Sequence, residues 1–307
     1  MRGGASVIEQ TVPRREGYAP VPGGQVHYQV VGDGPGIPLL TLHGGPGAGH
    51  DYLEPLAAQG QDRPVIFFDQ LGCGRSEQPG DPTLWRIERF TREVDALREA
   101  LGLRRVHLLG QSWGGWLAIE YMLGNPDGVV SLTLASTSAS LRQFVEEAAL
   151  LIDVMPEPHR SVLQRATSAA DYQTPEYAEA VLVFYQRHLC RLDPWPDALV
   201  RSVKNLDGNV VYATMNGPNE FTVTGNLAAW DRTADLGAIR VPTLITVGMY
   251  DEITPACAAT LHRGIPDSRL AMLYASAHTA HLEEPERYNR VLREFLTQVE
   301  SGAWSDE

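Results

Sequence analysis

A serine between glycines is the first feature of this chain that suggests chemistry. Gly110, Ser112 and Gly114 in "LLGQSWGGWLAI" fit the pattern G-x-S-x-G, with an apolar run before them and helix-forming residues after them. In this pattern a strained turn from a strand into a helix exposes the serine hydroxyl, and small residues two places away on each side let neighbouring backbone come close. We therefore predict that Ser112 is a nucleophile at the start of a helix.

A serine hydroxyl needs a base to remove its proton, and the base needs an acid to orient it. With this kind of turn, the order along the chain is serine, acid, histidine. Asp251 comes just after a late apolar run, and His278 and His281 both follow the last such run. We favour His278 as the base because it comes first after the strand and small residues precede it. Asp235 lies before a predicted strand, so Asp251 is the better candidate for the acid.

Acyl transfer also requires hydrogen-bond donors aimed at the oxyanion that develops in the transition state. The backbone N–H of Trp113, the residue after the nucleophile, is one expected donor. The second is expected from the loop after an early strand, where the sequence reads "LTLHGGPGAGHDY". Pro46 has no N–H to donate, so the donor there is Gly44 or Gly45.

Several other polar residues receive a structural interpretation. Cys73 has no recognisable base beside it, so we expect a packed thiol rather than a second nucleophile. Three histidines are expected to serve packing or loops: His43, His50 and His107. Two acidic pairs are expected on solvated helix faces: Glu146 with Glu147, and Glu283 with Glu284.

The elements that must position these residues follow from apolar runs separated by helical patterns. The runs cover residues 25–31, 38–43, 64–69, 106–110, 129–136, 241–248 and 270–274. After the first, they are apolar on both faces, which is typical of parallel strands covered by helices. Residues 86–102 and 284–299 have apolar positions at helical spacing. This alternation predicts an α/β layered fold, preceded by about twenty residues that we interpret as a loose lead-in.

The alternation stops between residues 140 and 228, where helix-like stretches are broken at proline-rich joints. We interpret this segment as a helical cap inserted over the carboxyl edge of the sheet. The predicted organisation is a core in two parts, 1–139 and 229–307, with the cap, 140–228, between them.

The composition of the chain argues against several classes of binding partner. The chain has 307 residues and a net charge of −13, and it lacks the basic stripe that neutralises nucleic-acid phosphates. No stretch approaches the length of about 18 apolar residues that a spanning helix needs, and the first residues lack a signal-peptide core. The three cysteines suit neither disulfides nor a metal site. We expect a cytoplasmic protein that binds no nucleic acid, membrane, metal or cofactor.

Five motifs together carry a resemblance to a known family. They are "HGGPG" (43–47), "DQLGCGRS" (69–76), "GQSWGG" (110–115), "NGPNEF" (216–221) and "GMYDEITP" (248–255). Together they resemble the proline iminopeptidases, particularly the branch of the tricorn-interacting aminopeptidase, within the α/β-hydrolases. The similarity covers residues 24–298, including the cap. Many relatives have Arg and Ser where this chain has Leu71 and Cys73, a departure that affects a structural loop.

The resemblance implies a mostly parallel sheet with helices on both faces, and it implies roles for the motif residues. It assigns Ser112 as the nucleophile with Asp251 and His278. It pairs Gly45 with Trp113 as oxyanion donors. It further implies that Glu220 and Glu252 hold the free amine of the substrate. Two carboxylates bind an ammonium group and offer nothing to a blocked terminus, so such a site favours unblocked peptides.

We therefore expect a serine aminopeptidase that removes an N-terminal residue, preferably proline, from short peptides or amino-acid amides. Six aromatic residues of the cap are candidates for the walls of a pocket for the pyrrolidine ring: Phe144, Tyr172, Phe184, Tyr185, Tyr212 and Phe221. The alternative with the same triad is an esterase or amidase of a small metabolite. A third possibility, a binding protein that retains the fold without turnover, conflicts with the complete set of triad candidates.

Overall fold

The apolar runs of the sequence form one central sheet. The computed structural model describes residues 12–169 and 171–304, and within them the sheet has eight strands. Their spatial order is β1 (Arg14–Val21), β2 (Gly24–Val31), β4 (Val65–Phe68), β3 (Leu39–Leu42), β5 (Val106–Gln111), β6 (Val129–Ala135), β7 (Thr243–Gly248) and β8 (Ser268–Leu273). From β4 to β8 all neighbours are parallel, so their carboxyl ends meet at one edge of the sheet.

The first strand corrects the expectation of a loose lead-in. Residues 14–21 form β1, which pairs antiparallel with β2, and β2 pairs antiparallel with β4. The polar and proline content that suggested a loop is compatible with this position. An edge strand has one side free of ladder hydrogen bonds, so it tolerates exposed polar residues and proline. Residues 1–11 of the lead-in lie outside the described residues.

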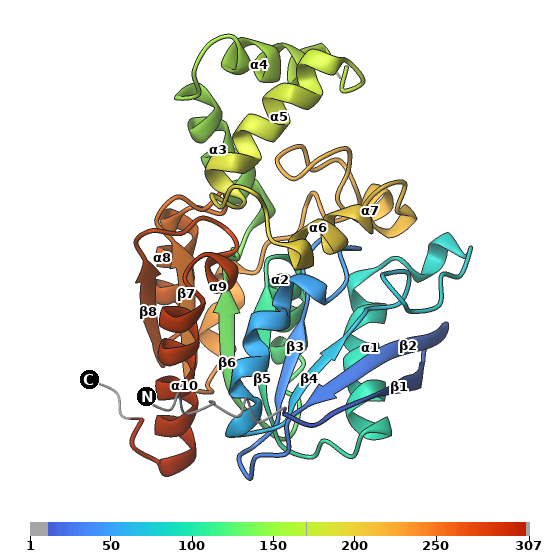
Figure 1. Cartoon of the computed structure of the whole chain (residues 1–307), viewed down its shortest axis with the longest axis vertical. Helices are drawn as coiled ribbons and strands as arrows, with labels where there is room; N and C mark the ends of the chain where they lie inside the picture. Colours follow the sequence, from blue (N-terminus) through green and yellow to red (C-terminus); the bar gives the residue numbers. More distant parts are fainter. Residues whose placement is uncertain (1–11, 170, 305–307) are drawn as a thin grey trace, which may run out of the picture.

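Helices cover both faces of the sheet, as the alternating pattern predicts. One face packs against α1 (Ile87–Ala100), α2 (Trp113–Leu123) and α8 (Pro255–Gly264), with the short 3₁₀ helices η2 (Pro82–Leu84) and η3 (Thr233–Ala238) nearby. The other packs against the 3₁₀ helix η1 (Asp51–Gln61), α9 (Ala280–Glu283) and α10 (Pro285–Ser301). The layers are visible in Figure 1. The expected α/β-hydrolase fold is thus confirmed.

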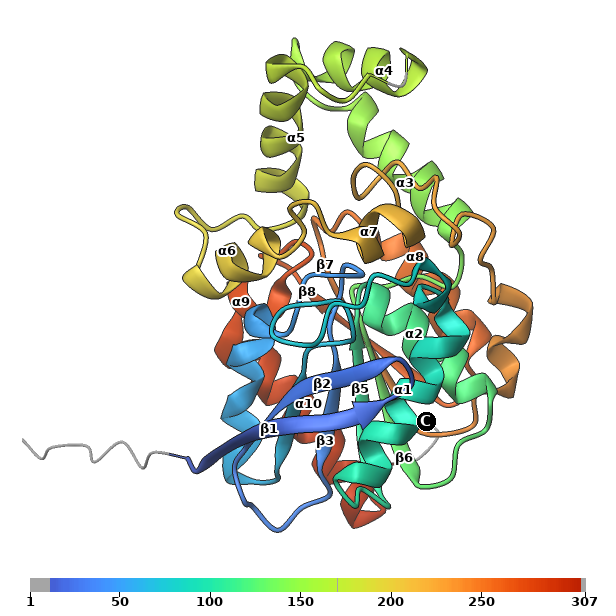
Figure 2. The same cartoon turned by 90° about the vertical axis from the view of Figure 1, so that its right-hand side faces the viewer.

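The segment after β6 leaves the layered body and forms the cap. It contains α3 (Leu141–Asp153), α4 (His159–Ala169), α5 (Pro175–His188), α6 (Asp197–Lys204) and α7 (Val210–Met215). Figures 1 and 2 show α4 standing away from the sheet, with α3 and α5 connecting it to the body and α6 and α7 lying close to the body. The cap therefore lies over the carboxyl edge of the parallel strands, where catalytic loops collect in α/β sheets.

Glycines make the tight passage from β5 into α2 possible. A Cβ atom on Gly114 would lie 2.0 Å from the carbonyl oxygen of Leu42, and a Cβ atom on Gly110 would lie 2.2 Å from that of Gly114. Both contacts are with backbone, which cannot move aside as a flexible side chain does. The glycines of the motif are thus required by the close packing of β3, β5 and α2.

We predict that Gly114→Ala destabilises the protein by about 2 kcal/mol or more, because overpacking a rigid site costs this order of free energy. Urea denaturation measures the free energy of unfolding. Gly80→Ala is the matched control, since its Cβ meets nothing within 4 Å; a change within about 0.5 kcal/mol is expected there. Equal stability of the two variants would contradict the close-packing explanation.

Candidate active site

Ser112 occupies the strained turn that its motif predicts. Its φ is 56° and its ψ is −124°, a backbone conformation that costs a non-glycine residue about 1–3 kcal/mol. Surrounding hydrogen bonds fix it: Ser112 N–H donates to Ala135 O at 3.0 Å, and Thr137 Oγ1 donates to Ser112 O at 2.9 Å. The turn therefore holds Ser112 in the lining of a cavity of about 430 Å³, part of it open to solvent.

His278 and Asp251 lie together at the carboxyl edge of the sheet. His278 Nδ1 lies 2.8 Å from Asp251 Oδ1, which also accepts a hydrogen bond from Ile253 N–H at 2.9 Å. The carboxylate therefore orients the imidazole with Nδ1 as donor, which leaves Nε2 as the nitrogen able to take up a proton. His278 and Ser112 line the same cavity.

Three carboxylates determine the protonation of His278. Burial lowers its pKa, but Asp251, Glu252 and Glu220 together raise the pKa to about 9. Glu252 Oε1 lies 3.9 Å from His278 Nε2, so this acid acts on the nitrogen that a base must use. A cation bound by Glu252 and Glu220 would weaken this effect and favour the neutral imidazole.

His281, the alternative base, has a different environment. Its Nε2 lies 3.0 Å from Tyr52 O, and its ring packs against Tyr52 and Tyr288. Burial lowers the pKa of His281 to about 3. The ring is therefore neutral and holds the η1 backbone in place.

The glycine-rich loop after β3 lies beside the nucleophile. Gly44 N–H donates to the hydroxyl of Tyr52 at 2.7 Å, so this N–H is already used within the protein. Gly45, with a φ of 111°, lines the cavity next to Ser112. This arrangement favours Gly45 over Gly44 as the donor to an oxyanion.

A chain of hydrogen bonds joins this loop to the histidine loop. The Tyr52 hydroxyl donates to Gln111 Oε1, and Gln111 Nε2 donates to His278 O at 3.2 Å. Sequence reasoning missed both residues, although Gln111 is the variable position before the motif serine. Nothing in the spacing of Tyr52 signals this role, because the contact depends on how η1 packs against β5.

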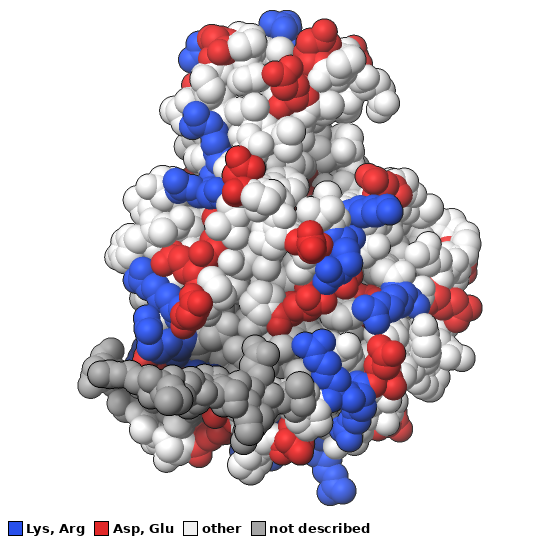
Figure 3. Space-filling view, in the orientation of Figure 1, with Lys and Arg blue, Asp and Glu red and all other residues white. Residues whose placement is uncertain are grey.

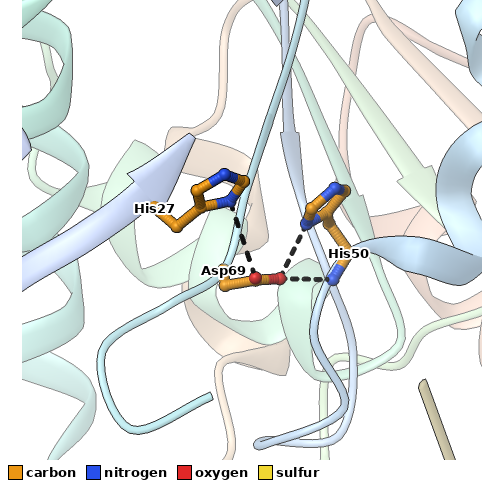
Figure 4. Close-up of side chains that lie close together, drawn as sticks. All are labelled: His27, His50 and Asp69. Atoms are coloured by element: carbon orange, nitrogen blue, oxygen red, sulfur yellow. Dashed lines mark hydrogen bonds and ion pairs between the residues drawn. The ribbon is translucent and has the colours of Figure 1, made fainter. Parts of the chain in front are cut away.

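A buried group of His27, His50 and Asp69 fixes the far end of the glycine-rich loop (Figure 4). Asp69 Oδ1 accepts hydrogen bonds from His50 N–H at 2.9 Å and from His50 Nδ1 at 2.7 Å, while Oδ2 accepts from Arg75 N–H. Among the described residues this is the group whose ligand atoms are close enough to hold a metal ion. Its carboxylate oxygens, however, are engaged by the protein, which favours the role of a loop anchor.

Glu220 and Glu252 lie near the histidine, as the resemblance implies. Glu220 lines the cavity and accepts a hydrogen bond from the Tyr212 hydroxyl at 3.0 Å. Glu252 is only 1% exposed, and its Oε2 has no hydrogen-bond partner within the described residues. Burial raises the pKa of both carboxyl groups, and the charge of Glu220 raises that of Glu252 further. Two such groups form a site suited to a cation.

The end of α5 links the cap to the loops that contain Asp251 and His278. His188 O accepts hydrogen bonds from Glu252 N–H at 3.1 Å and from His278 N–H at 3.2 Å, and Leu189 O accepts one from Thr279 N–H at 3.1 Å. The cap therefore braces the loops that carry the acid and the histidine, in addition to covering them.

Some of the six aromatic residues of the cap lie near Glu220 and Glu252, and others pack against further aromatic rings. Tyr212 contacts Glu220, and the charges of Glu220 and Glu252 raise the pKa of Tyr185, which is already raised by burial. Phe184 packs against Phe221 with ring centroids 4.9 Å apart. Of the other two, Phe144 contacts Trp116, and Tyr172 contacts Tyr177.

Three acidic residues expected on solvated helix faces form internal links, so that expectation was wrong for them. Glu283 accepts hydrogen bonds from Arg191 N–H and Ala277 N–H, both at 3.0 Å. Glu284 binds Ser276 Oγ, and Glu147 accepts from Thr254 Oγ1 at 2.8 Å. The contacts with Arg191 and Thr254 come from segments distant in sequence, and those with Ser276 and Ala277 come from the loop that precedes α9. Helical periodicity alone therefore does not reveal them.

Cys73 fits the expectation of a packed thiol. It is buried, and burial raises its pKa well above the ordinary value. The thiol therefore stays protonated and is a poor nucleophile.

Comparison with known proteins agrees with the fold. A family model described as alpha/beta hydrolase fold matches residues 37–285. The chain is therefore an α/β-hydrolase.

The similarity extends to a particular family. The proline iminopeptidase of Saccharolobus solfataricus is 40% identical over 289 residues, covering 93% of each chain. That of Thermoplasma volcanium is 40% identical over 92% of this chain and 96% of its own. The crystal structure of the Mycobacterium smegmatis proline iminopeptidase has a TM-score of 0.88 at 36% identity and covers 94% of this chain and 100% of its own. The chain belongs to the proline iminopeptidase family.

Two surface findings concern possible partners. Within the described residues, no helix combines the length and the apolar character needed to cross a membrane. Figure 3 shows basic side chains interspersed with acidic ones, with no basic stripe on the face in view. The exclusion of nucleic acid stays a prediction.

We predict that Glu252→Gln lowers the pKa of His278 by about one unit, because it removes a negative charge 3.9 Å from Nε2. If His278 is the base, its neutral imidazole is the active form, and kcat/KM for an amine-free ester is expected to rise with pH through this pKa. In the Glu252→Gln variant the increase of kcat/KM with pH is expected at lower pH than in the wild type. The measurement is the pH profile of p-nitrophenyl propionate hydrolysis.

Glu286→Gln is the matched control, since Glu286 is exposed at the start of α10. Its pH profile is expected to match that of the wild type. A Glu252→Gln profile that also matches would contradict the electrostatic coupling between Glu252 and His278.

Proposed function

We propose that this protein is a serine aminopeptidase that releases an N-terminal residue, preferably proline, from short peptides or amino-acid amides. The names of its relatives support the preference for proline. Ser112 is the proposed nucleophile, His278 the base and Asp251 the acid that orients it. Gly45 and Trp113 are the proposed oxyanion donors, and Glu220 and Glu252 the proposed amine-binding pair.

The buried acidic pair carries this proposal. Glu252 is almost fully buried with an unpartnered oxygen, and Glu220 lines the cavity that also contains Ser112 and His278. A buried carboxylate without a partner is costly, and an ammonium group relieves that cost by charge pairing and hydrogen bonding. A free N-terminus bound there places the first carbonyl of the peptide close to the nucleophile.

The reaction then proceeds in two stages. His278 removes the proton of Ser112 as Oγ attacks the carbonyl carbon, and the N–H groups of Gly45 and Trp113 stabilise the oxyanion. The protonated imidazole gives its proton to the leaving amine as the peptide bond breaks. In the second stage His278 activates a water molecule, which releases the amino acid and restores Ser112. The chain and water supply every group that these steps use.

Proline p-nitroanilide and its N-acetyl form test the amine-binding role. We expect the free form to be cleaved at least a hundredfold faster in kcat/KM, because the acetyl group removes the charge that Glu220 and Glu252 bind. Glu220→Gln and Glu252→Gln are expected to reduce this ratio at least tenfold. Glu146→Gln, on the exposed side of α3, is the matched control and should keep the ratio.

Equal rates for the free and acetylated anilides would contradict the aminopeptidase proposal. Rapid hydrolysis of simple esters together with slow cleavage of both anilides would favour the alternative, an esterase or amidase that uses the same triad.

The proposed location is the cytoplasm. All three cysteines are free and buried, which suits a reducing compartment.

A further inference from the structure

One wall of the cavity beside Ser112 is apolar and is not used by the proposed amine site. It is formed by Leu199, Val203 and Leu206, on α6 and in the turn that follows it. Their spacing of four and three residues places them on one face of the helix. Leu199 is buried, whereas Val203 and Leu206 are partly exposed. A partly exposed apolar face beside a nucleophile can bind apolar substrate groups.

The polar residues of the same segment hold this wall in position. Ser202 Oγ accepts a hydrogen bond from Tyr52 N–H at 3.0 Å, and Asn205 Nδ2 donates to Ala48 O at 2.8 Å. Arg201 binds Asp51 and Glu54 of η1. These contacts attach α6 to η1 and to the glycine-rich loop. The apolar wall is therefore fixed relative to the proposed oxyanion donor on that loop.

The orientation of the substrate follows from the amine site. In an α-amino acid the amine lies two bonds from the carbonyl carbon, so an ammonium bound at Glu220 places the acyl residue at the Glu220 end of the cavity. The chain beyond the cleaved bond must extend away from that end. The remaining lining is mainly apolar and includes Leu189 and Ala48, which packs in the same cluster as the α6 residues.

We propose that Leu199, Val203 and Leu206 form a subsite for the leaving group, which favours substrates whose second residue is apolar. This subsite rests on the proposed amine-binding role of Glu220 and Glu252. A leucine side chain gains by burial against the wall, whereas a charged side chain loses water without gaining a partner. Two acidic residues of η1, Asp51 and Glu54, already form ion pairs with Arg201 of α6.

The test compares kcat/KM for L-prolyl amides that differ only in the leaving group. The substrates are Pro-Leu-NH₂, Pro-Gly-NH₂, Pro-Asp-NH₂ and Pro-Lys-NH₂, with proline amide as the baseline. We expect the wild type to cleave Pro-Leu-NH₂ at least tenfold faster than Pro-Gly-NH₂, with Pro-Asp-NH₂ slower still.

Val203→Asp and Val200→Asp form a matched pair on the same helix. Val200 is 49% exposed and lies outside the cavity lining, so Val200→Asp should keep the wild-type order. Val203→Asp should lose most of the preference for Leu over Gly and gain activity on Pro-Lys-NH₂, each expressed relative to proline amide cleavage by the same variant. Val203→Thr, nearly equal in shape, gives a second variant with a smaller loss in the same direction.

Three results would overturn the subsite while leaving the aminopeptidase proposal intact. The first is equal wild-type rates for Pro-Leu-NH₂ and Pro-Asp-NH₂. The second is an unchanged order in both Val203 variants. The third is a change, in the Val203 variants, of the ratio of kcat/KM for Pro-Leu-NH₂ to that for Ala-Leu-NH₂. These substrates differ in the first residue, so this result would show that the wall contacts the acyl residue. Failure of the proposed function gives a different result, equal cleavage of free and N-acetylated substrates.

Discussion

The hydrogen bond between His278 Nδ1 and Asp251 Oδ1, 2.8 Å long, is the interaction on which the proposed chemistry depends. It selects which ring nitrogen can act as a base, and it joins two loops that follow different strands. Neither loop is held by this bond alone. The backbone of His188 accepts hydrogen bonds from both loops, and Gln111, next to the nucleophile, donates to His278 O. Removing the carboxylate would leave the imidazole without the partner that orients it, even though the strained turn at Ser112 would stay intact.

The cap has two functions in this arrangement. Its α5 end braces the acid and histidine loops, and its α6 face forms a wall of the cavity. The carboxylates of Asp251, Glu252 and Glu220 raise the pKa of His278. In the proposed mechanism an ammonium group at the acidic pair opposes this effect, which would link recognition of the substrate electrostatically to preparation of the base. An amine-free molecule in the same cavity would leave the base more fully protonated.

The sequence predicts the sheet, the covering helices and the cap because parallel buried strands and amphipathic helices have strong periodic signals. The exception is β1, whose polar edge position resembles a loop. Ser112, Asp251 and His278 follow from motif and chain order, and the structure places the last two in contact, although their roles stay predictions. The expected amine-binding role of Glu220 and Glu252 rests on the family resemblance and not on a local pattern. Tyr52, Gln111 and Glu283 were missed as positioning residues because their contacts with Gln111, His278 and Arg191 join segments distant in sequence, which local patterns do not encode.

Labelling with a fluorophosphonate probe tests the central claim most directly, since only an activated serine reacts rapidly. We predict that the label is found on Ser112 by peptide mapping and that Ser112→Ala abolishes it. Asp251→Asn and His278→Gln should each slow the labelling rate at least a hundredfold, with folding checked by circular dichroism. Labelling of another residue, or an unchanged rate in both folded variants, would contradict an aspartate-oriented histidine as the base that activates Ser112.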